Sequence, residues 1–121
     1  MRALAGALAL FATAAPGATA KVDVAGQRAL LKDWTLARCV GRGLGPGKAQ
    51  EDAFASASAL LERGLYDIAV YNRLDTLVDA QLARKYGGSV PGEFVMLKCL
   101  DLYHGAALAR AVAGARLTPV R

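Results

Sequence analysis

His104 is the only histidine in the chain and the side chain best suited to act as a general base near neutral pH. Asp101 lies three residues before it, and an aspartate–histidine pair can orient a base or hold a metal ion. One histidine and one carboxylate are too few ligands for zinc. We therefore predict no metal site and interpret His104 as a structural residue at a helix end; the alternative is an enzyme that uses both side chains.

Cys39 and Cys99 are the only cysteines, and an even number in an exported protein favours a disulfide. Closing a loop of about 60 residues in this way stabilises a domain by roughly 4 kcal/mol. A cysteine–histidine nucleophile requires a free thiol, so a disulfide removes it. The sequence predicts a disulfide and no catalytic residue or cofactor; the alternative is two separately buried thiols.

The first twenty residues have the organisation of a secretory signal peptide. Met1 and Arg2 precede an uncharged apolar run over 3–15, and small residues at 18–20 suit signal peptidase. We predict cleavage before Lys21, export to the periplasm, and a single domain over 21–121. The alternative is a buried N-terminal helix. The run is too short to span a bilayer well and no later stretch is longer, so we expect no membrane segment.

The formal net charge is +5, and removing residues 1–20 deletes only Arg2, which leaves +4. The basic residues are spread along the chain and interleaved with acidic ones. This arrangement is typical of a solvated surface, with a site for an acidic partner as the alternative. No basic cluster is present, so we expect no nucleic-acid binding.

Apolar residues at helical spacing predict helices over 25–42 and 49–63 and a third that starts at Tyr66 and Asp67. In the second helix Leu61 is predicted to be buried, and in the third Ile68. Trp34 falls on the apolar stripe of the first and is predicted to anchor the core. A short helix over 106–112 precedes a frayed tail over 115–121. No alternating pattern or hairpin turn predicts a strand, so the fold class is all-α, a compact bundle of about five helices.

The remaining stretch predicts a loop between two helices. Arg84 and Lys85 suit the last turn of the third helix, and Gly87 would end it in a left-handed conformation. Pro91 blocks helical geometry, so the next helix is expected to begin near Glu93. Residues 94–103 of that helix are apolar apart from two. This composition predicts that nearly every face of the helix is buried.

We call residues 87–93 the glycine loop. Pinned at both ends by helices, such a loop loses little conformational freedom on binding, and its glycines leave the backbone bare enough to enter a narrow cleft. The alternative is a plain helix–helix connector. The predicted partner-binding residues are Gly87, Gly88, Ser89, Val90, Pro91, Gly92 and Glu93.

Several segments resemble one protein family in collinear order over most of residues 28–110. They are Asp33-Trp34 with Arg38-Cys39, then ASALLERG (57–64), LVD (77–79), YGGSVPGEF (86–94) and MLKCLDLYH (96–104). The chain resembles the periplasmic amidase-immunity proteins of type VI secretion, which neutralise the group-four peptidoglycan amidase effectors.

This resemblance implies an all-helical homodimer that engages two effector molecules in a 2:2 complex. It further implies that the glycine loop enters the cleft of a papain-like cysteine amidase, with a helix of the other subunit adding contacts, and that the immunity protein has no activity of its own. The alternative function is a module that binds cell-wall or envelope components, which the net charge of the part after residue 20 also fits.

Overall fold

The computed structural model describes residues 6, 9 and 21–118. The predicted signal peptide over 1–20 therefore lies outside the described residues, apart from two isolated positions. Five helices follow one another in the order α1 (Val24–Gly43), α2 (Lys48–Arg63), α3 (Ile68–Leu82), α4 (Val95–His104) and α5 (Ala106–Gly114). The described part has no strand, which confirms the all-α bundle, and it contains no helix long and apolar enough to cross a membrane.

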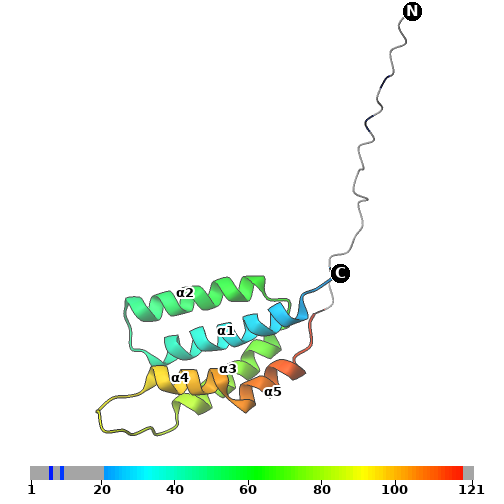
Figure 1. Cartoon of the computed structure of the whole chain (residues 1–121). Coiled ribbons are helices and arrows are strands. Elements are labelled where there is room, and N and C mark those ends of the chain that lie inside the picture. Colours follow the sequence, from blue (N-terminus) through cyan, green and yellow to red (C-terminus); the bar gives the residue numbers. More distant parts are fainter. Residues whose placement is uncertain (1–5, 7–8, 10–20, 119–121) are drawn as a thin grey trace, which may run out of the picture.

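Helix α1 is the central element, because it packs against each of the other four helices (Figure 1). Its buried face carries Leu31 and Trp34. The Trp34 ring meets the Tyr71 ring of α3 edge to face, with 4.9 Å between centroids. This confirms Trp34 as a core anchor. Helix α2 packs only against α1, through the small side chains of Ala53 and Ala57.

Two side chains predicted to be buried are exposed. Leu61 of α2 and Ile68 at the start of α3 are 38% and 60% exposed. Leu61 lines a hollow beside Trp34 of α1, and Ile68 is the first residue of α3, so the neighbouring helices leave both side chains partly uncovered. Asp67 is the residue before α3, but its side chain makes no capping hydrogen bond.

The C-terminal segment is tied to the bundle before the described residues end. The Thr118 amide donates to the Leu65 carbonyl over 2.7 Å, and Leu117 forms an isolated antiparallel bridge with Tyr66. The predicted frayed tail is therefore wrong for residues 115–118, because these backbone bonds hold them. Residues 119–121 lie outside the described part.

Salt bridges join α1 to α3. Arg38 donates two hydrogen bonds to the Asp75 carboxylate, at 2.9 and 3.0 Å, and Arg42 reaches Asp75 at 3.4 Å and Asp79 at 2.6 Å. Asp75 and Asp79 are four residues apart on α3, where like charges repel each other, and the arginines of α1 offset this repulsion by pairing with both.

Candidate functional site

The glycine loop is exposed along its whole length. Figure 1 shows that the chain between α3 and α4 extends away from the helices as a protruding loop. Val90 is 69% exposed, the largest exposure among the large apolar side chains. The structure thus gathers all seven predicted residues on one projecting surface.

Helix α3 ends earlier than predicted, at Leu82, and not in the turn before Gly87. Gly87 does not have a positive φ, so it is not a left-handed helix stop. The Leu82 carbonyl, left free at the helix end, accepts a hydrogen bond from Lys98 Nζ over 3.1 Å. This contact with α4 explains why Arg84 and Lys85 belong to the connection.

Helix α4 begins later than predicted, at Val95. Phe94, the residue before it, has φ 57°, and among the described residues it is the only non-glycine with positive φ. A residue in the left-handed conformation cannot belong to a right-handed helix, so the helix cannot extend back through Phe94 and Glu93 lies outside its first turn. The connection between the helices therefore spans residues 83–94.

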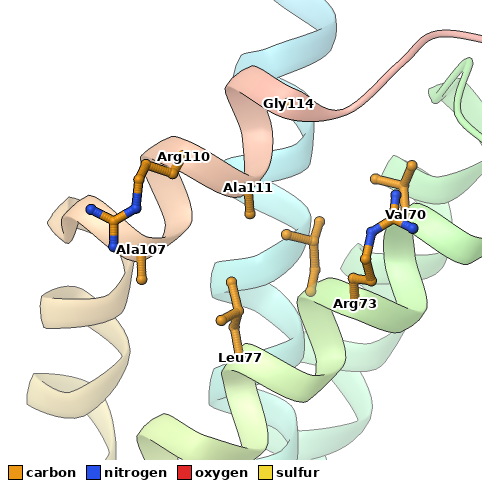
Figure 2. A pocket seen from close by; sticks show the side chains of 8 residues that line it. Val70, Arg73, Leu77, Ala107, Arg110, Ala111 and Gly114 are labelled. Atoms are coloured by element: carbon orange, nitrogen blue, oxygen red, sulfur yellow. The ribbon is translucent and has the colours of Figure 1, made fainter.

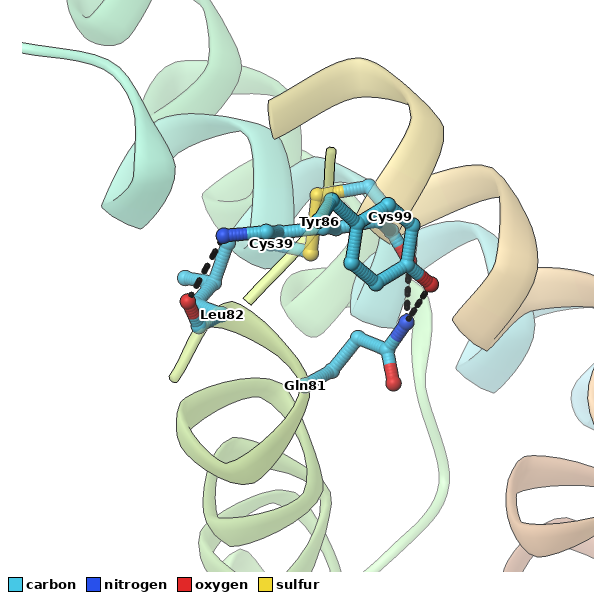
Figure 3. The surroundings of a disulfide bond; sticks show 6 residues. Cys39, Gln81, Leu82, Tyr86 and Cys99 are labelled. Carbon is cyan, nitrogen blue, oxygen red and sulfur yellow. Dashed lines mark hydrogen bonds between the residues drawn. A yellow bond between two sulfur atoms is a disulfide. The ribbon is translucent and has the colours of Figure 1, made fainter. Parts of the chain in front are cut away.

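A hydrogen-bonded group that we call the loop brace fixes the chain just before the glycine loop, and Figure 3 shows its members Gln81 and Tyr86. Tyr86 donates its hydroxyl to Asp101 Oδ2 over 2.6 Å and accepts from Gln81 Nε2 over 3.0 Å. Gln81 also donates to the Lys98 carbonyl over 2.9 Å. The loop brace is thus Gln81, Tyr86, Lys98 and Asp101, and it ties the connection to both α3 and α4.

The hydrogen bond to Asp101 raises the pKa of Tyr86 above the usual tyrosine value, because the carboxylate accepts the proton that ionisation would remove. Tyr86 is half-buried and Gln81 is only 8% exposed. The helical pattern of the sequence indicated this role for neither residue, because the acceptors that complete the group, the Asp101 carboxylate and the Lys98 carbonyl, lie on α4.

The predicted disulfide is confirmed. Cys39 on α1 and Cys99 on α4 are joined with a Cα–Cα distance of 5.6 Å, and both are fully buried (Figure 3). Cys99 follows Lys98, so the bond anchors the α4 side of the loop brace to the central helix. The end of α1 packs closely against the two residues that flank the connection. At Gly43 there is no room for a Cβ, because it would collide with Val95 and Leu82.

Helix α4 was predicted to be buried nearly all round, and this is wrong. Cys99 and Leu102 are buried, but Met96, Leu97 and Leu100 are 56%, 47% and 39% exposed. They lie on one side of the helix, because they occupy positions i, i+1 and i+4. The short bundle has no further element to cover this side. An apolar surface therefore continues from the glycine loop onto α4.

The residues considered for catalysis do not form a site. His104 is exposed, and its ring meets the Tyr103 ring edge to face at 5.0 Å. The Asp101 carboxylate accepts the hydrogen bond from the Tyr86 hydroxyl. Within residues 21–118, no group of three or more histidine, cysteine or acidic side chains is arranged to hold a metal ion.

The family model Tai4, described as type VI secretion system (T6SS), amidase immunity protein, matches residues 29–112. A search of curated proteins finds no match.

Solved structures with the same fold come from effector–immunity systems. A chain of the Tae4/Tai4 structure from Salmonella typhimurium is 28% identical with TM-score 0.73, over 82% of this chain and 100% of that one. A chain of the Tae4–Tai4 complex from Enterobacter cloacae is 25% identical with TM-score 0.65, over 84% and 100%. A complex of S. typhimurium Tae4 with E. cloacae Tai4 contains a chain that is 27% identical with TM-score 0.65, over 78% and 98%.

Proposed function

The chain belongs to the family of type VI secretion system amidase immunity proteins, and we propose that it binds a secreted peptidoglycan amidase and protects the cell that makes it. Proteins of this family are inhibitors and not enzymes, and they act in the periplasm. The partner is thus an amidase effector, and this chain needs no catalytic group of its own.

The glycine loop is the part that enters the active-site cleft of the amidase. One observation carries this proposal: every residue of the loop is exposed, yet the loop brace and the disulfide fix the chain on either side of it. A protruding segment with fixed ends has little conformational entropy left to lose on binding. Gly87, Gly88 and Gly92 carry no side chain, so the backbone can approach the walls of a narrow cleft.

The loop cannot form the whole interface. A specific protein complex buries on the order of 1,600 Å² in total, which is more than seven residues supply. Met96 and Leu97 lie in the first turn of α4, directly after the loop, and their exposed side chains extend the contact surface.

Replacing Gly88 with tryptophan tests the insertion. A Cβ at Gly88 would meet the Phe94 ring at 3.4 Å, an ordinary contact, so the fold can accept a side chain there. We expect Gly88→Trp to lose inhibition of the cognate amidase, because the indole would block entry into the cleft. Its free energy of unfolding should stay within about 0.5 kcal/mol of the wild type.

Gly45→Trp is the matched control. Gly45 lies in the connection between α1 and α2, and a Cβ there would have no neighbour within 4 Å. This variant should inhibit as the wild type does. Full inhibition by both Gly88→Trp and Gly92→Trp would exclude the glycine loop from the mechanism.

We also propose that residues 1–20 are a cleaved signal peptide, that 21–121 form the mature domain, and that this domain acts as a homodimer in a 2:2 complex with the amidase. The sequence pattern supports the first two points, and the family resemblance supports the third. Intact mass and light scattering on protein purified from the periplasm test them. A retained Met1, or a monomer in the complex, would contradict them.

A further inference from the structure

Three surface hollows follow the side of α3 that faces α5. The first, of about 410 Å³, lies between the middle of α3 and α5 (Figure 2). It shares Val70, Arg73 and Gly114 with a second hollow of about 540 Å³ toward the C-terminal segment. It shares Leu77 and Ala107 with a third of about 200 Å³, which reaches Gln81 and Arg84. Because neighbouring hollows share lining residues, the three lie in a row along α3, and we call this row the arginine trench.

The trench exists because α5 presents small residues to α3. Ala107, Ala111 and Gly114 occupy positions i, i+4 and i+7 and so lie on one face of α5. Opposite them, Val70, Leu74 and Leu77 give the trench an apolar floor. At 1.5 Å per residue, the stretch of α3 from Val70 to Gln81 is about 16 Å long, enough for roughly five residues of extended chain.

Arginines surround this apolar floor. Figure 2 shows Arg73 on α3 and Arg110 on α5 on opposite sides of the first hollow. Arg116 lines one end of the trench and Arg84 the other. Among the described residues, Arg38 and Arg42 are the only basic side chains that form ion pairs within 4.0 Å. The four arginines of the trench therefore have no carboxylate partner in the described part of the chain. Asp67, at the Arg116 end, is the one acidic residue that lines the trench.

We propose that the arginine trench binds an acidic segment of the amidase, one that carries aliphatic side chains between its carboxylates. Aliphatic groups suit the floor, and carboxylates suit the four unpaired guanidinium groups. The trench ends at Gln81 of the loop brace, so a partner whose cleft holds the glycine loop can continue along it. This inference rests on the proposed function and adds a second, separately testable contact.

The test is binding of the cognate amidase to the variant Arg73→Glu/Arg110→Glu, measured by surface plasmon resonance at low and high salt. We expect Kd to rise roughly tenfold or more, mainly through a slower association rate, with a weaker salt dependence. At saturating concentration the variant should still inhibit fully, because its glycine loop is unchanged. Thermal melting of each variant alone checks that the fold is intact.

Lys48→Glu/Arg63→Glu is the control, because it changes net charge equally on α2, which packs only against α1. The control variant should change Kd less than threefold.

An unchanged Kd for the trench variant, or equal weakening of binding by the control variant, would overturn the proposal. A trench variant that becomes monomeric while its Kd per subunit is unchanged would make the trench a contact between copies and would also overturn it. A further outcome is that the trench variant binds the amidase more weakly while Gly88→Trp and Gly92→Trp both inhibit fully. That result would support binding at the trench and refute insertion of the glycine loop.

Discussion

Tyr86 lies one residue before the glycine loop, and its hydroxyl is the point at which the loop is fixed to the bundle. The hydroxyl connects Gln81 of α3 with Asp101 of α4. Removing it leaves the Asp101 carboxylate without its donor and frees the chain that leads into the loop. The side chain therefore acts as a positioning residue, and its effect on inhibition passes through the geometry of the loop.

For Tyr86→Phe we expect weaker amidase binding, with Kd raised roughly threefold to tenfold because more conformational freedom is lost on binding. Titration calorimetry with the cognate amidase measures this. Hydrogen exchange of the variant alone should show faster exchange over 83–94 and unchanged exchange in the core of α1. Wild-type affinity together with faster exchange would show that the order of the loop does not limit binding.

The same hydroxyl gives a pH dependence. Its pKa is higher in the folded protein than the unfolded value of about 10, so its contribution to stability is fully present below about pH 10 and is lost as pH rises through the folded pKa. Wild type should thus be more stable than Tyr86→Phe near neutral pH, and the difference should vanish in strong alkali. Denaturant unfolding of both proteins at a series of pH values isolates Tyr86, since the other tyrosines are common to both. A constant difference would contradict this role.

At the scale of elements, α1 organises the bundle, and polar contacts supplement its apolar ones. The half-buried Asp75 carboxylate on α3 receives Arg38 and Arg42 from α1, and Arg38 also lies over the Trp34 and Phe54 rings at 5.6 and 5.3 Å. These contacts join α1 to α3, and α3 leads into the connection that contains the glycine loop.

Asp75→Asn should destabilise the domain by about 1–3 kcal/mol, because it removes a bidentate charged contact and leaves two arginines close together. Chemical denaturation measures the change in the free energy of unfolding. Asp52→Asn on the exposed face of α2 is the control and should change it by less than about 0.5 kcal/mol. Equal effects of the two substitutions would mean that the salt bridges add nothing specific.

At the scale of the molecule, the disulfide holds together elements that are distant in sequence. It joins residues 60 positions apart and connects the central helix to α4 beside the loop brace. The bond also fits the periplasm, where disulfides persist. Stability and inhibition should therefore both respond to its loss.

Cys39→Ala/Cys99→Ala should lose about 2–4 kcal/mol of stability, mainly because the unfolded chain gains freedom. Urea denaturation with and without reductant measures this, and reductant should lower the wild-type midpoint toward that of the variant. The variant itself should not respond to reductant, which serves as the control. A wild-type midpoint that reductant leaves unchanged would show that the bond is not reduced or does not contribute.

The sequence alone determined the local features of this protein. Helical spacing and glycine positions predicted α1 and α2 within a residue or two, and the glycine and proline positions predicted a loop over 87–93. The cysteine pair and the resemblance to amidase immunity proteins were also present in the sequence. The helical and loop signals depend on residues within one or two helical turns of each other, and the cysteine count and the family motifs are properties of the sequence itself, so no tertiary information is needed to interpret them.

The tertiary structure decided where α3 ends and which side of α4 is covered. Lys98 Nζ binds the carbonyl of Leu82, and this contact from another helix outweighs the differences of less than 1 kcal/mol by which local propensity favours continuing the helix. Met96 and Leu97 are apolar, but no helix packs over them, and a count of apolar residues cannot reveal a missing neighbour. The loop brace, the salt bridges of Asp75 and the arginine trench likewise join residues from different helices, so only the packing of the bundle creates them.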